Sequence, residues 1–251
     1  MSLLDATMIV AGSMIGSGIF IVSADIARNT GSAGWLIIVW VITGFMTVAA
    51  ALSYGELSAM YPKAGGQYVY LREAYNPLTA FLYGWSFFSV IQTATIAAVG
   101  VAFAKFTTYI FPVISEDTIL INFGFLSISS AQLLSIVVIV LLTYINSRGV
   151  QSGKIVQTTF TLAKLLSLFS LIIVGSMVSN SNIWHSNWQD AWRLHKLNLD
   201  GSLETYSTMA AAGAVAAAMV GSVFSSDAWN NVTFIAGEIK NPKRNIGLAL
   251  F

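Results

Sequence analysis

Glycines interrupt the first apolar segment of the chain near its middle. Gly12, Gly16 and Gly18 fall within seven residues, and Ser17 lies between the last two. Because each glycine costs about 1 kcal/mol relative to alanine inside a helix, we expect the backbone to open around Ser17. Such a break, with amides on one half-helix and carbonyls on the other, suits a small zwitterion. Alternatively, these small residues only let neighbouring helices pack closely.

A second interruption lies in the last long apolar segment, at residues 224–231 (FSSDAWNN). Serine, aspartate and asparagine are costly at membrane depth unless they face a cavity, so we expect a second broken helix. Asp227 has two interpretations. Its carboxylate recognises a cationic side chain, or it caps the N–H groups of a half-helix that begins at Trp229. The cap is favoured, and neutral substrates are therefore expected first.

Lys164 lies nine residues beyond Ile155, where the fifth apolar segment begins. At 1.5 Å per residue it is roughly 14 Å into a hydrocarbon core about 30 Å thick, too deep to reach water easily. We therefore expect its ammonium to face the helix bundle, to pair with carbonyls or a carboxylate, and to serve a function. Alternatively, Lys164 has a purely structural role, or it carries a proton.

The composition places the chain in a membrane and excludes several other classes of protein. Of 251 residues, 56% are hydrophobic and only 9% are charged, which is too apolar for a soluble domain. The net charge of +1 suggests no nucleic-acid partner. Without cysteine there is no disulfide or thiolate metal site, and we expect no cofactor. No nucleophile has a neighbouring histidine or carboxylate pair, which disfavours an enzyme, and no ring of like charges indicates a channel.

Six apolar segments, each long enough or nearly long enough to cross a bilayer as a helix, predict an all-α membrane protein. We treat residues 1–251 as a single transmembrane domain. The six segments cover about 3–26, 34–59, 78–111, 131–145, 155–178 and 206–236, and a seventh begins at 245–251. The interrupted segments are the first and the sixth, which hold equivalent positions if a five-helix unit repeats. A repeat with an odd number of spans must be inverted in the membrane.

Basic residues predict the orientation, because the cytoplasmic side normally carries the excess of Lys and Arg. A cytoplasmic N-terminus leaves only Arg28, Arg193 and Lys196 in the opposite loops. It places seven others inside: Lys63, Arg72, Arg148, Lys154, Lys240, Lys243 and Arg244. We therefore expect the N-terminus in the cytoplasm.

Three tryptophans recur at four-residue spacing in the longest polar connection of the chain. Trp184, Trp188 and Trp192 share one face if this stretch is helical. Tryptophan is enriched at membrane interfaces, so we expect an interfacial belt or a cap on the bundle rather than a binding site.

The chain resembles the amino acid–polyamine–organocation superfamily, and within it permeases of the bacterial L-amino acid transporter type. Four runs carry the resemblance: residues 12–20 (GSMIGSGIF) in the first helix, 54–57 (YGEL) with 61–70 (YPKAGGQYVY) after the second, 224–230 (FSSDAWN) in the sixth, and 238–245 (EIKNPKRN) after it. The resemblance implies a leucine-transporter-like inverted-repeat fold. Since the family has about twelve spans, this chain would be truncated, comprising the first five-helix repeat and the broken sixth helix.

The resemblance also implies roles for individual residues. The substrate carboxylate would meet the amides and hydroxyl of Ser17 and Gly18, with Gly16 permitting close approach. The amine would meet carbonyls of residues near both breaks, and the predicted substrate-binding set is completed by Met14, Ile15, Phe224, Ser225, Ser226 and Asp227. Phe224 aligns with the aromatic gate. Lys164, in 161–166 (TLAKLL), matches a lysine that reaches the first helix near its break and holds the site together in place of a sodium ion.

The sequence therefore predicts a secondary transporter in the bacterial cytoplasmic membrane. It would move small neutral L-amino acids by alternating access, as sodium-independent exchange. Its expected partners are an L-amino acid substrate, the lipid bilayer and a missing C-terminal half. The alternatives are a truncated membrane fragment that does not transport, and a permease for cationic amino acids or amines.

Overall fold

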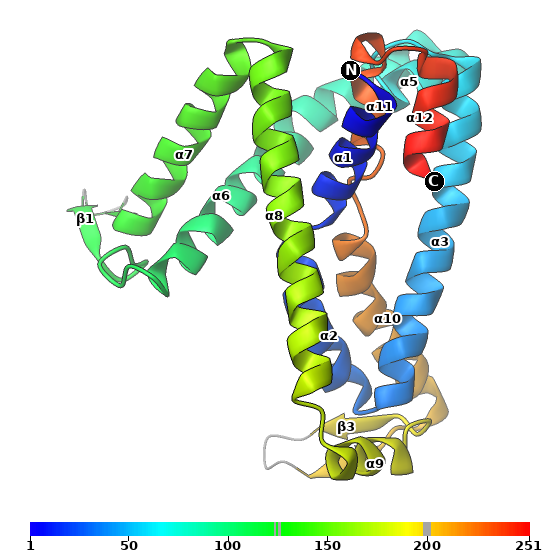
Figure 1. Cartoon of the computed structure of the whole chain (residues 1–251), viewed down its shortest axis with the longest axis vertical. Coiled ribbons are helices and arrows are strands. Elements are labelled where there is room, and N and C mark those ends of the chain that lie inside the picture. The colour runs from blue at the N-terminus through cyan, green and yellow to red at the C-terminus, as the bar shows by residue number, and fades with distance from the viewer. Residues whose placement is uncertain (123, 125–126, 198–201) are drawn as a thin grey trace. The chain divides into compact units, whose positions relative to one another are not determined.

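The computed structural model describes residues 1–122, 124, 127–197 and 202–251, and these residues are mostly helical (Figure 1). The longer helices are α1 (Leu3–Met14), α2 (Gly18–Thr30), α3 (Ala33–Met60), α5 (Pro77–Ser86), α6 (Thr93–Thr108), α7 (Ser130–Ser147), α8 (Val150–Met177) and α10 (Thr208–Ser225). The shorter helices are α4 (Gln67–Ala74), the π-helix η1 (Phe87–Gln92), α9 (Ser181–Gln189), α11 (Asn231–Phe234), the 3₁₀ turn η2 (Ala236–Glu238) and α12 (Pro242–Leu250).

Six stretches among the described residues are long and apolar enough to cross a membrane. They are Leu3–Thr30, Ala33–Met60, Pro77–Thr108, Ser130–Ser147, Val150–Met177 and Thr208–Ser225. The first contains the break between α1 and α2. The third contains η1 and has 32 residues, so its helical length of about 48 Å exceeds a core of about 30 Å. It must tilt or extend beyond the bilayer.

The expectation of an all-α protein was wrong for two connections between the spans. β1 (Ile119–Asn122) pairs antiparallel with β2 (Ser127–Ser129), and β3 (His195–Leu197) pairs antiparallel with β4 (Leu203–Thr205). No strand was expected in either region, and the second region was described only as part of the longest polar connection. Backbone groups outside the bilayer still need hydrogen-bond partners, and these short hairpins supply them.

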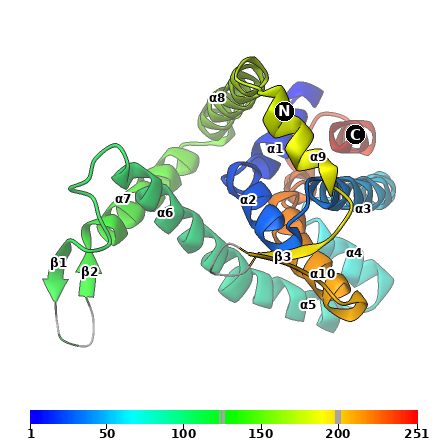
Figure 2. The same ribbon diagram turned by 90° about the horizontal axis from the view of Figure 1, so that it is seen from below.

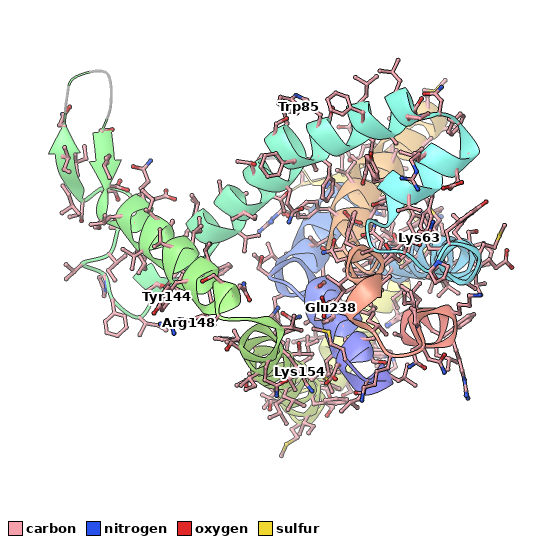
Figure 3. The ribbon with its side chains drawn as sticks, turned by 90° about the horizontal axis from the view of Figure 1, so that it is seen from above. Lys63, Trp85, Tyr144, Arg148, Lys154 and Glu238 are labelled. Carbon is pink, nitrogen blue, oxygen red and sulfur yellow. The ribbon has the colours of Figure 1, made fainter. Side chains whose placement is uncertain are left out.

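The chain divides into two compact units. One unit contains residues Leu71–Val156, and the other contains Met1–Tyr70 with Gln157–Phe251. In the Leu71–Val156 unit, α6 packs on α7, and Ser135 Oγ donates to Gly100 O at 2.9 Å. At the end of α7, the guanidinium of Arg148 lies over the ring of Tyr144, 4.7 Å from its centroid (Figure 3). Whether the two units act as one functional domain stays a prediction.

The second unit, which holds both predicted breaks, has two separate apolar cores. One joins α2, the first half of α3 and α10, through Val22, Val39 and Ala218. The other joins α1, the second half of α3, α11 and α12, through Val10, Ala51 and other apolar residues. α3 therefore contributes to both cores, one on each side of the breaks.

Two polar contacts tie α3 to the helices that flank the breaks. Thr43 Oγ1 and Ser222 Oγ of α10 are hydrogen-bonded at 2.7 Å, and both residues are fully buried. One turn earlier, Trp40 Nε1 donates to Ser23 Oγ of α2 at 3.2 Å. The two contacts hold α2 and α10 against the same stretch of α3.

We expect Thr43→Val to destabilise the protein by about 0.6 kcal/mol, the average value of one hydrogen bond between membrane helices. Thermal unfolding of the detergent-solubilised chain measures this effect. Thr143→Val is the matched control, because Thr143 Oγ1 bonds only the carbonyl of Ile139 in its own helix. Equal melting temperatures for the two variants would contradict the prediction.

A cap formed by residues 181–197 and 202–205 docks on the turn between α2 and α3 (Figures 1 and 2). Ala191 O accepts hydrogen bonds from Ser32 Oγ and from the amide of Gly34, the latter at 2.9 Å. Trp35 Nε1 donates to Trp192 O at 3.0 Å. The predicted tryptophan face thus belongs to a cap, in which the rings of Trp184, Trp188 and Trp192 follow one another at 5.5 and 6.2 Å.

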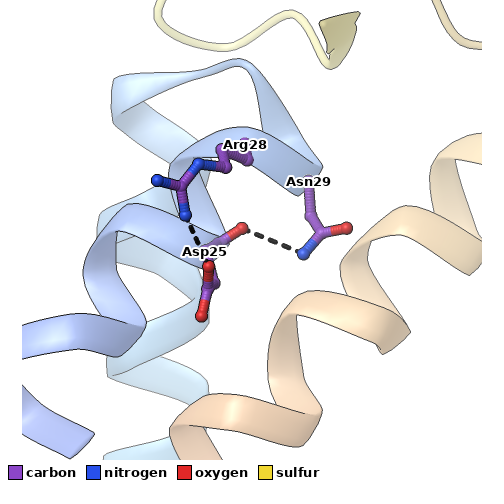
Figure 4. Close-up of polar contacts among 3 residues, drawn as sticks. All are labelled: Asp25, Arg28 and Asn29. Atoms are coloured by element: carbon purple, nitrogen blue, oxygen red, sulfur yellow. Dashed lines mark hydrogen bonds and ion pairs between the residues drawn. The ribbon is translucent and has the colours of Figure 1, made fainter. Parts of the chain in front are cut away.

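The last turn of α2, beneath this cap, carries its own polar contacts. Arg28 Nη1 lies 2.7 Å from Asp25 Oδ1, and the side-chain Nδ2 of Asn29 donates to the backbone oxygen of Asp25 at 2.9 Å (Figure 4). Both members of the ion pair are more than half exposed, so the pair contributes little to stability. Gly31 then ends α2 in the left-handed conformation, with φ of 55°.

Candidate functional site

The predicted interruption of the first segment is present. α1 ends at Met14 and α2 begins at Gly18. The amide of Gly16 bonds to Met14 O at 2.9 Å instead of to the carbonyl of Gly12, as it would in a continuous helix. The carbonyl of Gly12 is thereby released from the helical ladder.

Ser17 precedes α2 and makes no side-chain capping hydrogen bond to it. Both Ser17 and Gly16 are exposed. The first amides of a helix have no partner within the helix and carry partial positive charge. The hydroxyl of Ser17 and the first amides of α2 are hydrogen-bond donors of the kind that a carboxylate requires, and their role in binding one stays a prediction.

The second interruption is present but shorter than predicted. Phe224 and Ser225 are still helical, and the non-helical residues are 226–230. Ala228 adopts a left-handed backbone with φ of 68°, which is strained for a residue with a Cβ. Trp229 is only 8% exposed and packs in the core with α1, so the turn at Ala228 directs the chain back into the protein.

The expected capping role of Asp227 was wrong. The next helix, α11, begins at Asn231 rather than at Trp229, and Asn230 is its N-cap residue without a side-chain hydrogen bond. The strained turn at Ala228 delays the restart of the helix beyond the reach of Asp227. Its side chain is exposed instead.

The two breaks meet at Gly18 and Ser225. A Cβ on Gly18 would overlap the side chain of Ser225, whose hydroxyl donates to Gly221 O at 2.9 Å. The first residue of α2 is therefore in contact with the last residue of α10. By contrast, a Cβ on Gly16 would have no atom within 4 Å, so the backbone there faces open space.

Lys164 reaches the first break from α8. Its Nζ donates to Gly12 O at 3.0 Å, which is the contact that the family resemblance implied. The last carbonyls of a helix lack partners within the helix and carry partial negative charge, so an ammonium is well suited to this position. The role of this contact in place of an ion stays a proposal.

The other predicted site residues are less closely grouped. Phe224 is 75% exposed, and with Asp227 it borders a shallow hollow of about 510 Å³ along α10. Met14 packs against the core that contains Trp229. Ile15 and Ser226 are half-buried, and the amide of Ser226 bonds to Ser222 O at 3.0 Å. The structure thus joins Gly18 to Ser225 and Lys164 to Gly12, and leaves Phe224 and Asp227 open.

An aromatic cluster that the sequence did not predict lies behind the second break. The ring of Tyr54 lies 5.0 Å from Trp229 and 5.8 Å from Tyr70, in edge-on contacts. Burial raises the pKa of the Tyr70 phenol, and a hydrogen bond with Thr233 offsets part of that increase. These contacts join Tyr54 of α3 to Tyr70 of α4 and to Trp229, two residues before α11. Tyr54 and Trp229 are far apart in the chain, so a single sequence does not indicate that their rings are in contact.

Comparison with known proteins identifies similar chains. A family model described as "Amino acid permease" matches residues 1–251. The human large neutral amino acids transporter small subunit 2 is 31% identical over 252 residues, covering 99% of this chain and 43% of that protein. The mouse b(0,+)-type amino acid transporter 1 is 29% identical, covering 99% of this chain and 46% of that protein. The chain spans somewhat less than half the length of these relatives.

Proposed function

Because this chain belongs to the amino acid permease family, whose members are membrane transporters and not enzymes, we propose that it forms the substrate-binding part of a secondary transporter. The transporter moves small neutral L-amino acids by alternating access, as sodium-independent exchange. The name of one relative, a transporter of large neutral amino acids, supports the neutral charge of the substrate but not its small size.

The observation that carries the proposal is the contact between the two breaks at Gly18 and Ser225. It brings the amide end of α2 beside the carbonyl end of α10. Three residues separate the carbonyl end of α1 from the amide end of α2. A free amino acid has one carboxylate and one ammonium on the same carbon. The amide end of a helix favours the carboxylate, and the carbonyl end of a helix favours the ammonium. In this proposal the carboxylate binds at Ser17 and Gly18, and Phe224 gates the site.

Sodium independence rests on Lys164. Its ammonium already supplies positive charge to Gly12 O, at the carbonyl end of α1. A cation bound there would compete with it. In this proposal the ammonium of Lys164 takes the place of a coupling sodium ion at the carbonyl end of α1.

The finer assignments are proposed on the same basis. The chain adopts the first five-helix repeat and the broken sixth helix of a leucine-transporter-like inverted-repeat fold, as in bacterial L-amino acid transporters. It lies in a bacterial cytoplasmic membrane with its N-terminus inside. The excess of Lys and Arg in the loops on that side supports this orientation.

Two other functions have specific support. Since the chain spans less than half of its relatives' length, it would be a membrane fragment that binds without transporting unless the remaining half is supplied. Since Asp227 is exposed and does not cap α11, its carboxylate is free to select a cationic amino acid or amine.

Uptake of radiolabelled L-alanine into proteoliposomes tests the transporter proposal. The chain and a full-length relative are reconstituted side by side, with and without unlabelled L-alanine inside. Exchange predicts that internal alanine accelerates uptake by both proteins. Uptake by the relative alone, with alanine binding retained by the chain, would favour the non-transporting fragment.

Competition assays test the charge preference of the site. We expect unlabelled alanine to displace bound L-alanine at lower concentration than arginine does, and Asp227→Asn to leave that order unchanged. Because Asp227 does not cap α11, this expectation rests on the relative that is named as a transporter of large neutral amino acids. Arginine that competes better than alanine, and that loses its advantage in Asp227→Asn, would reverse the assignment.

A further inference from the structure

Thr161 is the only fully buried residue of α8, every residue of which the structure describes. It is 1% exposed, although most of the helix is open. A polar side chain is an unusual choice for the one buried position of an apolar helix. Its burial therefore points to a specific contact rather than to general packing.

The contact of Thr161 is with α1, just before the first break. Its hydroxyl donates to Gln157 O in its own helix at 2.8 Å and is shared with Met8 O of α1 at 3.2 Å. A Cβ on Gly12 would overlap this hydroxyl. Because Gly12 has no side chain, α1 can approach Thr161 closely. This close approach explains why a glycine occurs at position 12, where α1 is still helical.

Lys164 follows Thr161 by one helical turn on the same side of α8. Its four-carbon side chain has many rotamers and loses much conformational entropy when its end is held in place. The hydroxyl of threonine sits on the Cβ and moves little relative to its backbone. A short, stiff contact at Thr161 therefore sets where the long, flexible side chain of Lys164 meets α1.

We propose that Thr161 is a positioning residue. It fixes the register of α1 against α8, so that the ammonium of Lys164 stays on the carbonyl of Gly12. The inference deepens the proposed function, because it concerns how the site's lysine is held in place. It can be tested separately, because the position of the ammonium is measurable without substrate.

The test measures how fast an amine-reactive reagent modifies Lys164 in the chain reconstituted in phosphatidylcholine nanodiscs. Peptide mass spectrometry reports the rate relative to Lys105, an exposed lysine of α6. Thr161→Val and Thr161→Ala both remove the hydroxyl but differ in volume, and Thr161→Ser keeps it. We expect about threefold faster modification in the first two variants, as for the loss of one hydrogen bond between membrane helices, and an unchanged rate in Thr161→Ser.

The matched control is Thr95→Val, because the hydroxyl of Thr95 bonds only Ile91 O within α6. It should leave the Lys164 rate unchanged. Equal rates in Thr161→Val, Thr161→Ala and the unmutated chain would overturn the proposal, and so would a change in Thr161→Ser as large as in the other two. A faster rate in Thr161→Ala alone would assign the effect to lost volume, because valine nearly matches threonine in size, and would overturn it as well.

Binding of radiolabelled L-alanine by the same variants separates this inference from the proposed function. Faster modification of Lys164 together with weaker alanine binding supports both. Faster modification with unchanged alanine binding would support the positioning role of Thr161 and contradict the role of Lys164 in the substrate site.

Discussion

Replacing Lys164 with alanine is expected to reduce L-alanine uptake by about tenfold in a full-length protein that carries this chain. The variant leaves the carbonyl of Gly12 without the ammonium that bonds it at 3.0 Å. A buried acceptor without a partner costs about 1–3 kcal/mol, and 1.4 kcal/mol corresponds to a factor of ten. Uptake into proteoliposomes, scaled to the amount of folded protein, measures the effect.

Controls distinguish the roles considered for Lys164. Lys105→Ala removes an exposed lysine near the end of another span and should change uptake little. A fall in folded yield as large as the fall in uptake would indicate a purely structural role. Strict sodium dependence of the unmutated protein would contradict the proposal, whereas proton-driven uptake that is lost in Lys164→Ala would favour proton carriage.

The second large effect is expected at Gly18, where the two breaks meet. In Gly18→Ala the new methyl group overlaps the side chain of Ser225, and overpacking of this kind costs about 1–3 kcal/mol. We expect alanine binding to weaken about tenfold as the ends of α2 and α10 separate. Ser225→Gly, introduced together with Gly18→Ala, removes the overlapping atoms and should recover most of the binding.

Gly16→Ala separates substrate binding from helix packing. The added methyl group has no protein atom within 4 Å, so the melting temperature should not change. Weaker alanine binding in this variant would then come from the substrate's own approach to the backbone. Undiminished binding in both Gly16→Ala and Gly18→Ala would place the substrate elsewhere.

Much of this arrangement was predictable because breaking a membrane helix leaves a clear signal in sequence. Glycines at 16 and 18 and the polar run after Phe224 stand out in apolar surroundings, and both segments are interrupted near those positions. The depth of Lys164 could be counted along its helix, and the family resemblance supplied its partner. These features depend on local composition and on helix geometry.

The features that were not predicted depend on the path of the backbone after a break and on contacts between residues far apart in the sequence. Whether Asp227 caps a helix depends on the residue at which that helix restarts, and the left-handed turn at Ala228 is not typical of alanine. The burial of Thr161 depends on a glycine about 150 positions away in the chain. The two antiparallel strand pairs between candidate spans have strands of only three or four residues, too short for a reliable alternating pattern.

The contact between Gly18 and Ser225 also has a consequence for biogenesis. The two residues are separated by about 200 positions, so at 5–20 residues per second α2 leaves the ribosome about 10–40 s before its partner on α10 is made. During that interval α3 is already available, and the hydrogen bond from Trp40 to Ser23 joins it to α2. The pair formed by α2 and α3 would hold α2 in place in the nascent chain until α10 is made and packs against both helices.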